Sequence, residues 1–188
     1  ARYAEKPQIW SGKPNVALTE VVKNVPPGNA LELACGEGAD AIWLAEEGWV
    51  VHAVDISPTA IQRGRVQAEK VGVDKSISWE VADLTNWVAN GQFDLITAIF
   101  KHSRSELKRN QILKNALNAL APGGALLIVG HAEFPFWANT AQHDHEHEPL
   151  PTNAEVIEQL ELTDSYEVEL NENRSRIATG PDGQTGEL

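Results

Sequence analysis

The sequence predicts an α/β fold in which helices cover both faces of a doubly wound, mostly parallel sheet. Three observations lead to this fold class. Short apolar segments typical of strands alternate along the chain with segments of helical periodicity. A glycine turn, Gly36-Glu37-Gly38, separates the first strand from the first crossover helix. The 188 residues are 42% apolar and 22% charged, which is typical of a folded domain.

The elements are expected in the order helix, strand, helix, strand. An N-terminal helix closes over 19–24, before Pro26-Pro27-Gly28. Ser57 as N-cap and Pro58 at the first helical position begin the second crossover helix. The remaining ranges are strands over 29–33, 50–55, 77–81, 93–100 and 125–129, helices over 39–47, 58–71, 106–120 and 153–162, a turn over 121–124 and a strand over 166–170.

The turn after the first strand has the properties of a ligand-binding turn. Gly36 and Gly38 have no Cβ, so the backbone can adopt positive φ and approach a ligand closely. The helix that follows directs its N-terminus at the same place. The sequence 36–41 also satisfies G-x-G-x-x-G/A, and Asp55 follows Gly36 at about the 20-residue spacing of a dinucleotide site. Spacing alone therefore leaves a dinucleotide ligand open.

Glu32 favours a different nucleoside ligand. It lies inside the first strand just before the turn, where a dinucleotide site has no need of a carboxylate. A ligand with a cationic amino-acid end would use Glu32, directly or through water, because charge-assisted hydrogen bonds are about twice as strong as neutral ones. Asp55 ends the second strand and Asp83 follows the third. Three acids are thus expected at the carboxyl ends of successive strands, where open α/β sheets bind ligands.

The segment from Glu32 to Gly38, ELACGEG, resembles the first motif of the class I S-adenosylmethionine-dependent methyltransferases, E/D-x-G-x-G-x-G. Ala34 replaces the first glycine, and we expect this small residue to suffice with a negative φ. The resemblance extends from about residue 10 to residue 130, and the small size resembles the single-domain tellurite-resistance and thiopurine methyltransferases. It implies a Rossmann-like sheet. We expect the family's last strand to be absent, since the sequence reaches Leu188 before it.

The resemblance implies S-adenosylmethionine as the cofactor and methyl transfer to a small molecule as the activity. Asp55 matches the acid that binds the ribose hydroxyls in this family, and Asp83 matches the acid that faces the adenine amine. The implied cofactor-binding residues are Glu32, Ala34, Cys35, Gly36, Gly38, Asp55, Ile56, Asp83 and Leu84. An NAD-type oxidoreductase and a non-catalytic S-adenosylmethionine-binding module remain as alternatives.

Two histidines are candidates for a general base: His102 just after the fourth strand and His131 just after the fifth. A base is needed only if the acceptor arrives protonated, because the sulfonium is already activated. The alternative is that either histidine caps a strand or bonds a loop carbonyl.

His143, His145 and His147 alternate with acids, a combination that suits zinc but equally a solvated lid. We assign no metal ligands, because neither a preformed geometry nor a second shell follows from the sequence, and both interpretations of this loop stay open.

We expect a single methyltransferase domain over 1–188, with an N-terminal cap segment at 1–28 and a lid-like loop at 131–151. The only cysteine, Cys35, excludes an internal disulfide framework, and we expect it to be a packed thiol.

Charge and composition predict the partners. The net charge of −12, from 15 basic and 27 acidic residues, disfavours nucleic acid, whose binding depends on Lys and Arg. No apolar run approaches the roughly 18 residues of a membrane span, and the start does not resemble a signal peptide. We expect a cytoplasmic enzyme with a small-molecule acceptor and neither a nucleic-acid nor a membrane partner. The sequence does not indicate an oligomeric state.

Overall fold

The computed structural model describes residues 12–99, 106–133, 150–175, 177–179 and 183–187. The chain divides into two compact units, Ala1–Val129 and Gly130–Leu188. Every residue of the predicted cofactor site belongs to the first unit.

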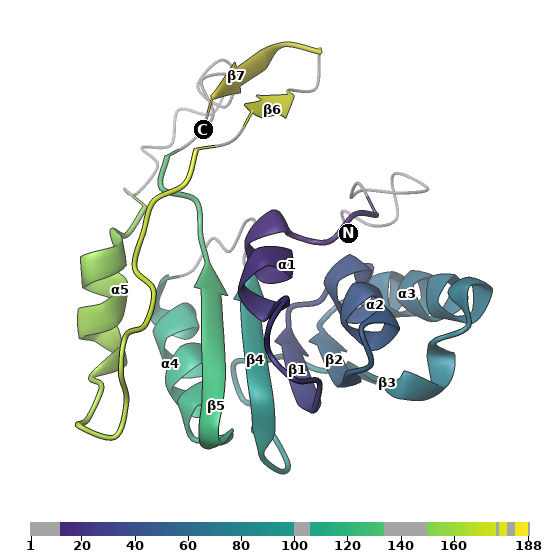
Figure 1. The fold of residues 1–188 in the computed structure, drawn as a ribbon, viewed down its shortest axis with the longest axis horizontal. Helices are drawn as coiled ribbons and strands as arrows, with labels where there is room; N and C mark the ends of the chain where they lie inside the picture. Colours follow the sequence, from purple (N-terminus) through teal and green to yellow (C-terminus); the bar gives the residue numbers. More distant parts are fainter. Residues whose placement is uncertain (1–11, 100–105, 134–149, 176, 180–182, 188) are drawn as a thin grey trace. The chain divides into compact units, whose positions relative to one another are not determined.

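A five-stranded parallel sheet forms the centre of the first unit, in the order β3-β2-β1-β4-β5 (Figure 1). Its strands are β1 (Asn29–Leu33), β2 (Val50–Asp55), β3 (Ile77–Val81), β4 (Phe93–Ile99) and β5 (Leu120–Val129). All four neighbouring pairs are parallel. The chain builds outwards from β1 to β3, then returns to the other side of β1 with β4. This reversal between β1 and β4 is the topological switch point of a doubly wound sheet, and it confirms the predicted fold class.

The helices begin and end close to the predicted positions. They are α1 (Val16–Val22), α2 (Ala39–Glu46), α3 (Pro58–Val71), the short 3-10 helix η2 (Asp74–Ser76) and α4 (Glu106–Leu117). The Ser57 side chain accepts a hydrogen bond from the Ala60 amide at the start of α3, as the N-cap prediction requires. Gly72 ends α3 in the left-handed conformation.

Side-chain contacts show that helices cover both faces of this sheet. Trp79 of β3 lies against Gly38 and Gly64, which belong to the start of α2 and to α3. On the other face, Leu33 at the end of β1 lines a small cavity together with Ile112 of α4. The apolar core between these layers includes Leu18, Ala30, Leu44, Trp49 and Leu95. Because helices cover both faces of the sheet, most residues of its central strands are apolar.

The fifth strand is longer than predicted. It begins at Leu120, so the expected turn over 121–124 is part of the strand. Phe93 pairs with Leu120, and the register shifts before Leu95 pairs with Ala125. Gly124 makes this irregularity possible, because a Cβ there would lie 2.8 Å from the Phe93 carbonyl oxygen. Pro122-Gly123-Gly124 therefore does not separate the helix from the strand as predicted, because pairing with β4 continues on both sides of it.

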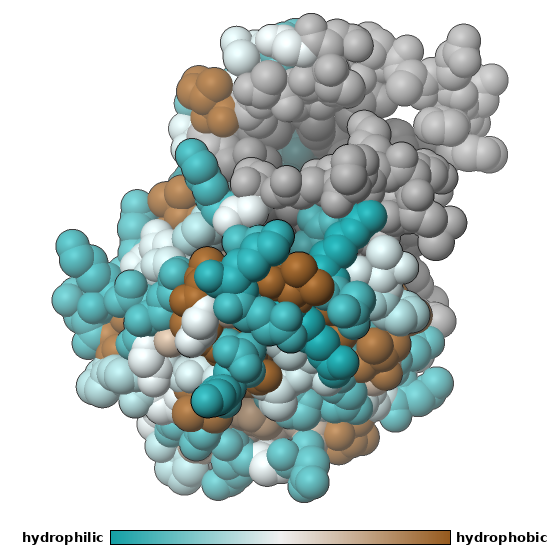
Figure 2. Space-filling model, turned by 90° about the vertical axis from the view of Figure 1, so that its right-hand side faces the viewer, coloured by the Kyte–Doolittle hydropathy of each residue, from teal (hydrophilic) through white to brown (hydrophobic). Residues whose placement is uncertain are grey.

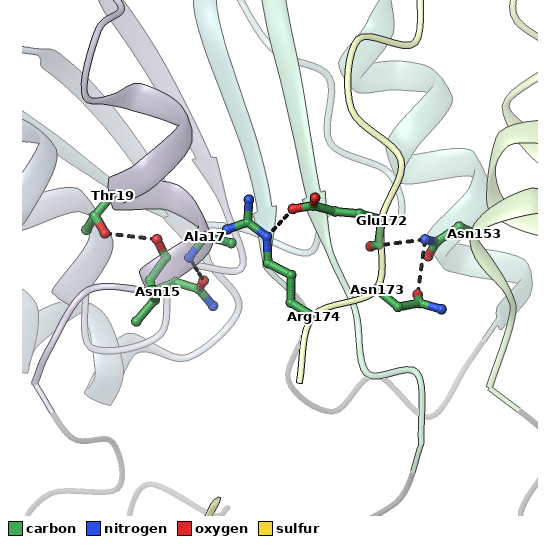
Figure 3. A network of polar contacts seen from close by, with 8 residues as sticks. Asn15, Ala17, Thr19, Asn153, Glu172, Asn173 and Arg174 are labelled. Atoms are coloured by element: carbon green, nitrogen blue, oxygen red, sulfur yellow. Dashed lines mark hydrogen bonds and ion pairs between the residues drawn. The ribbon is translucent and has the colours of Figure 1, made fainter. Parts of the chain in front are cut away.

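The second unit contains α5 (Asn153–Leu160) and an antiparallel pair, β6 (Ile177–Thr179) and β7 (Thr185–Glu187). Thr152 and Glu155 form a capping box that starts α5. The strand predicted over 166–170 is wrong, since this segment is exposed and pairs with no strand of the described chain. Asn153 donates from Nδ2 to the Glu172 carbonyl and to Asn173 Oδ1 (Figure 3). These bonds connect the residues just after 166–170 to the start of α5.

Apolar and polar residues are interspersed on the face of the molecule in Figure 2. Exposed large apolar side chains on the first unit include those of Val50, Ile56, Val66 and Val81. Among the described residues, no helix has the length and apolar character needed to cross a membrane.

Candidate nucleoside-binding site

Two of the three predicted acids lie together at the switch point. Glu32 is the fourth residue of β1 and Asp55 is the last residue of β2, and both side chains are buried. Asp83 follows β3 and is exposed. The Ala82 amide donates to the Asp55 carbonyl oxygen at 3.1 Å, which holds the start of the Asp83 loop beside the end of β2.

The glycine turn is fastened to β2 by backbone and carboxylate bonds. The Cys35 amide donates to the Val54 carbonyl oxygen at 3.0 Å, and the Gly36 amide donates to Asp55 Oδ2 at 2.8 Å. Asp55 Oδ1 accepts from the Ser57 amide, also at 2.8 Å. Asp55 therefore has one oxygen fixed by the turn and the other by the start of α3. Because each carboxylate oxygen has a further lone pair, both can still accept from a ligand.

The φ expected for Ala34 is wrong. Ala34 has φ 57°, and Gly36 and Gly38 have φ 58° and 76°. The Cβ of an alanine in the left-handed region approaches a carbonyl oxygen, at a cost of about 1–2 kcal/mol. The glycine that the resembling family carries at this position is thus explained by backbone conformation.

Gly38 has a packing role that the sequence did not indicate. A Cβ on Gly38 would lie 2.2 Å from Cη2 of Trp79, and one on Gly64 would lie 2.6 Å from the same atom. The Trp79 ring therefore occupies the space that side chains on both glycines would need. The absence of a Cβ at Gly38 thus allows the backbone to lie close to Trp79 of the same chain. Trp79 packs α2 and α3 against β3.

The environment of the Glu32 carboxyl group disfavours its charged form. Burial, and then the negative charge of Asp40, raise the pKa of Glu32 well above its ordinary value; Asp55 adds to this, and the backbone N–H of Ala41 opposes it. Asp40 lies in the first turn of α2 and accepts from the Asn15 amide at 2.6 Å. Three acids thus surround the turn and the start of α2, which makes this place favourable for a cation.

Two buried polar atoms near the turn lack a hydrogen-bond partner among the described residues: Glu32 Oε2 and Thr97 Oγ1. Glu32 and Thr97 are register partners on β1 and β4, so their side chains lie on the same face of the sheet. Buried polar atoms are nearly always satisfied, and a polar ligand group would satisfy these. Sequence reasoning missed Thr97. Its signal was a lone hydroxyl within Leu95-Ile96-Thr97-Ala98-Ile99.

Other predicted residues lie around this centre. Cys35 is buried, and burial, then the charges of Glu32 and Asp55, raise the pKa of its thiol, which agrees with a packed and unreactive group. Ile56 is 65% exposed beside Asp55, whereas Leu84 is buried. Asp83 Oδ1 accepts from the Thr85 amide at 2.9 Å, which shapes the turn in which Asp83 lies.

Several predictions fall outside this geometry. His102 and the histidines at 143, 145 and 147 lie outside the described residues, as do residues 1–11 of the cap segment and most of the lid-like loop. His131 is described and belongs to the second unit. Within the described residues, no group of three or more His, Cys, Asp or Glu side chains has the arrangement of a metal site.

The region that contains the sheet and the glycine turn matches a known protein family. Residues 30–124 match the model of the family described as "Methyltransferase domain". The match covers half of the chain, including all five strands up to the middle of β5. The chain therefore belongs to the methyltransferase-domain family, as the resemblance of its first motif predicted.

Two relatives show the range of this family. The chain is 31% identical over 132 residues to 2-heptyl-1-hydroxyquinolin-4(1H)-one methyltransferase of Mycobacteroides abscessus, covering 67% of this chain and 58% of that protein. It is 29% identical over 121 residues to ribosomal RNA small subunit methyltransferase C of Alcanivorax borkumensis, covering 61% and 36%. The chain thus spans less than two thirds of the length of either relative.

Solved structures confirm the fold. TehB from Haemophilus influenzae aligns with a TM-score of 0.69 and 19% identity, over 93% of this chain and 59% of that chain. A methyltransferase from Geobacter sulfurreducens in complex with S-adenosyl-L-homocysteine aligns with a TM-score of 0.55 and 19% identity, over 67% and 52%. At these identities the likeness concerns the fold alone.

Proposed function

We propose that this chain binds S-adenosylmethionine and transfers its methyl group to a small-molecule acceptor. The observation that carries the proposal is the buried Glu32 carboxyl group, which has an unsatisfied oxygen beside the glycine turn. A buried carboxylate is costly unless a cation or several hydrogen bonds compensate it. The ammonium of the methionine end of the cofactor is such a cation. Thr97, beside Glu32 in the sheet, offers a hydroxyl to the same group.

The nucleoside end follows from the other two acids. We assign the ribose hydroxyls to Asp55, whose oxygens are fixed by Gly36 and Ser57 and keep lone pairs for further donors. We assign the adenine amine to Asp83, whose loop is bonded to the end of β2. Membership of the methyltransferase-domain family supports this assignment.

The electrostatics of the turn disfavour the dinucleotide alternative. A dinucleotide places its pyrophosphate at the N-terminus of the first crossover helix. Here that end has Asp40 in its first turn, with Glu32 and Asp55 close enough for their charges to interact. Three carboxyl groups would repel a pyrophosphate, whereas they attract an ammonium and a sulfonium.

Methyl transfer requires little chemistry from the protein. The cofactor supplies a methyl group activated by a sulfonium: the acceptor's lone pair forms the new bond to carbon, and the electrons of the breaking carbon–sulfur bond remain on sulfur. The side chains hold the two ends of the cofactor and exclude water, so that the acceptor meets the methyl group in line. We keep His102 and His131 as proposed bases for an acceptor that arrives protonated.

We propose a small molecule as the acceptor. The quinolone methyltransferase among the relatives supports this choice, whereas the ribosomal RNA methyltransferase represents the competing class. The net charge of −12 favours the small molecule, because RNA binding depends on basic side chains.

We further propose that the whole chain forms one methyltransferase domain, with 1–28 as a cap and 131–151 as a lid. The single cysteine supports a cytoplasmic location.

Calorimetry separates the two cofactor classes. We expect S-adenosylmethionine and S-adenosylhomocysteine to bind, and NADH to bind at least tenfold more weakly, roughly 1.4 kcal/mol. Asp83→Ala should weaken S-adenosylhomocysteine binding about tenfold by removing the adenine contact. The matched control is Asp74→Ala, since Asp74 is an exposed residue of η2. Binding of NADH without either adenosyl compound would favour the oxidoreductase.

Turnover distinguishes an enzyme from a binding module of the same fold, because fold does not determine function. The assay measures S-adenosylhomocysteine formed from S-adenosylmethionine in the presence of thiols, amines, hydroxyquinolones and oxyanions. We expect production above the acceptor-free rate with at least one class. Tight cofactor binding without production from any of them would favour the non-catalytic module.

A further inference from the structure

The loop between β3 and β4 contains Asp83. After Asp83, its residues Leu84 and Trp87 line a small cavity beside the sheet. Its first turn is closed by Asp83 itself, since the Thr85 amide donates to Oδ1 and the Asn86 amide donates to the Asp83 carbonyl oxygen at 3.2 Å. The position of the Asp83 carboxylate therefore depends on what holds residues 84–87 in place.

Trp87 is the anchor of this turn. Its Nε1 donates to Glu80 Oε1 at 2.8 Å, so a residue of β3 holds the far end of the turn. The other oxygen of Glu80 accepts from His52 Nε2 of β2, also at 2.8 Å. The rings of His52 and Trp87 meet edge to face, with centroids 6.0 Å apart and planes at 69°. Glu80 thus uses both carboxylate oxygens to join β2, β3 and the turn.

Trp87 also lies near apolar residues of the sheet and of α4. Trp87 and Leu84 line the same small cavity as Leu33 of β1 and Ile112 of α4. Leu84, the residue after Asp83, is buried there. The Asp83 carboxylate consequently lies between two fixed points. The bond from Ala82 to Asp55 precedes it, and the buried Leu84 and the Trp87–Glu80 bond follow it.

We propose that Glu80 and Trp87 are positioning residues that orient Asp83 toward the adenine amine and thereby set the preference for adenine over other bases. This inference rests on the proposed binding of S-adenosylmethionine. Neither residue touches the ligand in this account: both act through the turn that contains Asp83. His52 supports Glu80 from β2 and completes the connection.

The test compares two ligands of the full chain by calorimetry: S-adenosylhomocysteine and S-inosylhomocysteine, in which an oxygen replaces the 6-amine. The adenine amine donates to Asp83, whereas the inosyl ligand presents a carbonyl oxygen at that position and keeps a donor only at N1, so the parent should prefer the adenosyl ligand. Glu80→Ala and Trp87→Phe should reduce that preference about three- to tenfold, which is within the range expected for one typical hydrogen bond. Their affinity for the inosyl ligand should change less than twofold.

Conservative variants separate positioning from folding. Glu80→Gln keeps an oxygen that accepts from Trp87 Nε1, so it should retain most of the preference that Glu80→Ala loses. Trp87→Phe keeps an aromatic ring in the cavity and removes only the N–H donor. Glu69→Ala, on the exposed side of α3, makes the same chemical change as Glu80→Ala away from the loop and should behave as the parent.

The outcomes are distinct. Loss of adenine preference in Glu80→Ala and Trp87→Phe, with recovery in Glu80→Gln, would support the inference. Equal weakening of both ligands, no change in either, or a parent without preference would overturn it while leaving the proposed cofactor intact. A parent that binds neither ligand would overturn the proposed function, and this inference with it.

Discussion

At the scale of single residues, the backbone at Ala34 is the clearest departure from expectation. The motif of the resembling family has glycine here, and a small residue with negative φ was expected to replace it. Because φ is 57°, alanine carries a conformational cost that glycine would not. The sequence located the turn, but the expected sign of φ was wrong, because φ depends on how the turn is bonded to Val54 and Asp55.

Ala34→Gly should therefore stabilise the ligand-free chain. Relief of about 1–2 kcal/mol at positive φ is partly offset by the greater freedom of glycine in the unfolded state, about 0.4–1 kcal/mol, so we expect a net gain of roughly 0.5–1 kcal/mol. Urea unfolding followed by circular dichroism measures it. Ala45→Gly in α2 is the control and should destabilise, since glycine disfavours a helix interior. A less stable Ala34→Gly variant would contradict the account of the turn.

At the scale of helices and strands, the arrangement of three elements explains the raised pKa of Glu32. The ends of β1 and β2 and the start of α2 bring Glu32, Asp40 and Asp55 together, although no two of them are neighbours in sequence. Burial and the charge of Asp40 raise the pKa of Glu32, so the folded chain binds a proton more tightly there than the unfolded chain does. From the unfolded pKa of about 4.3–4.5 upward, this difference lowers stability as pH rises, until the folded pKa is passed.

Glu32→Gln should remove this dependence. In the ligand-free chain, the variant should gain stability relative to the parent as pH rises from about 4.5, by at most about 1.4 kcal/mol per pH unit for one proton. It should also weaken S-adenosylhomocysteine binding, because the amide cannot compensate the ammonium. Urea midpoints at several pH values provide the measurement. Glu69→Gln removes an exposed carboxylate and serves as the control. A constant stability difference between Glu32→Gln and the parent would show that Glu32 does not titrate as described.

Strand ends could be predicted from the sequence, and cross-strand packing could not. Glu32 and Asp55 were placed correctly because parallel strands all end at one edge of the sheet. The contacts of Trp79 with Gly38 and Gly64 join residues from three elements, and periodicity within one element contains no information on them. The same holds for the Glu80–Trp87 bond and for Thr97, whose significance appears only when β4 lies beside β1.

At the scale of the whole molecule, the doubly wound sheet was predictable because helices and strands alternate up to β5, except between β3 and β4, where a loop takes the place of a helix. Beyond residue 130 the prediction was weaker. The exposed segment over 166–170 has the alternation of a strand but no partner strand in the described chain. The composition predicted an acidic protein, and we propose that Glu32, Asp40 and Asp55 use part of that charge to attract a cationic ligand.

We propose that the carboxyl edge of β1, β2 and β3 binds the two ends of S-adenosylmethionine. A crystal structure of the chain with S-adenosylhomocysteine tests this most directly. We expect the ammonium at Glu32, directly or through one water, the ribose hydroxyls at Asp55 and the adenine amine at Asp83, with the loop over 131–151 facing the sulfur. A ligand bound away from Glu32 and Asp55, or with its adenine at Glu32, would contradict the account.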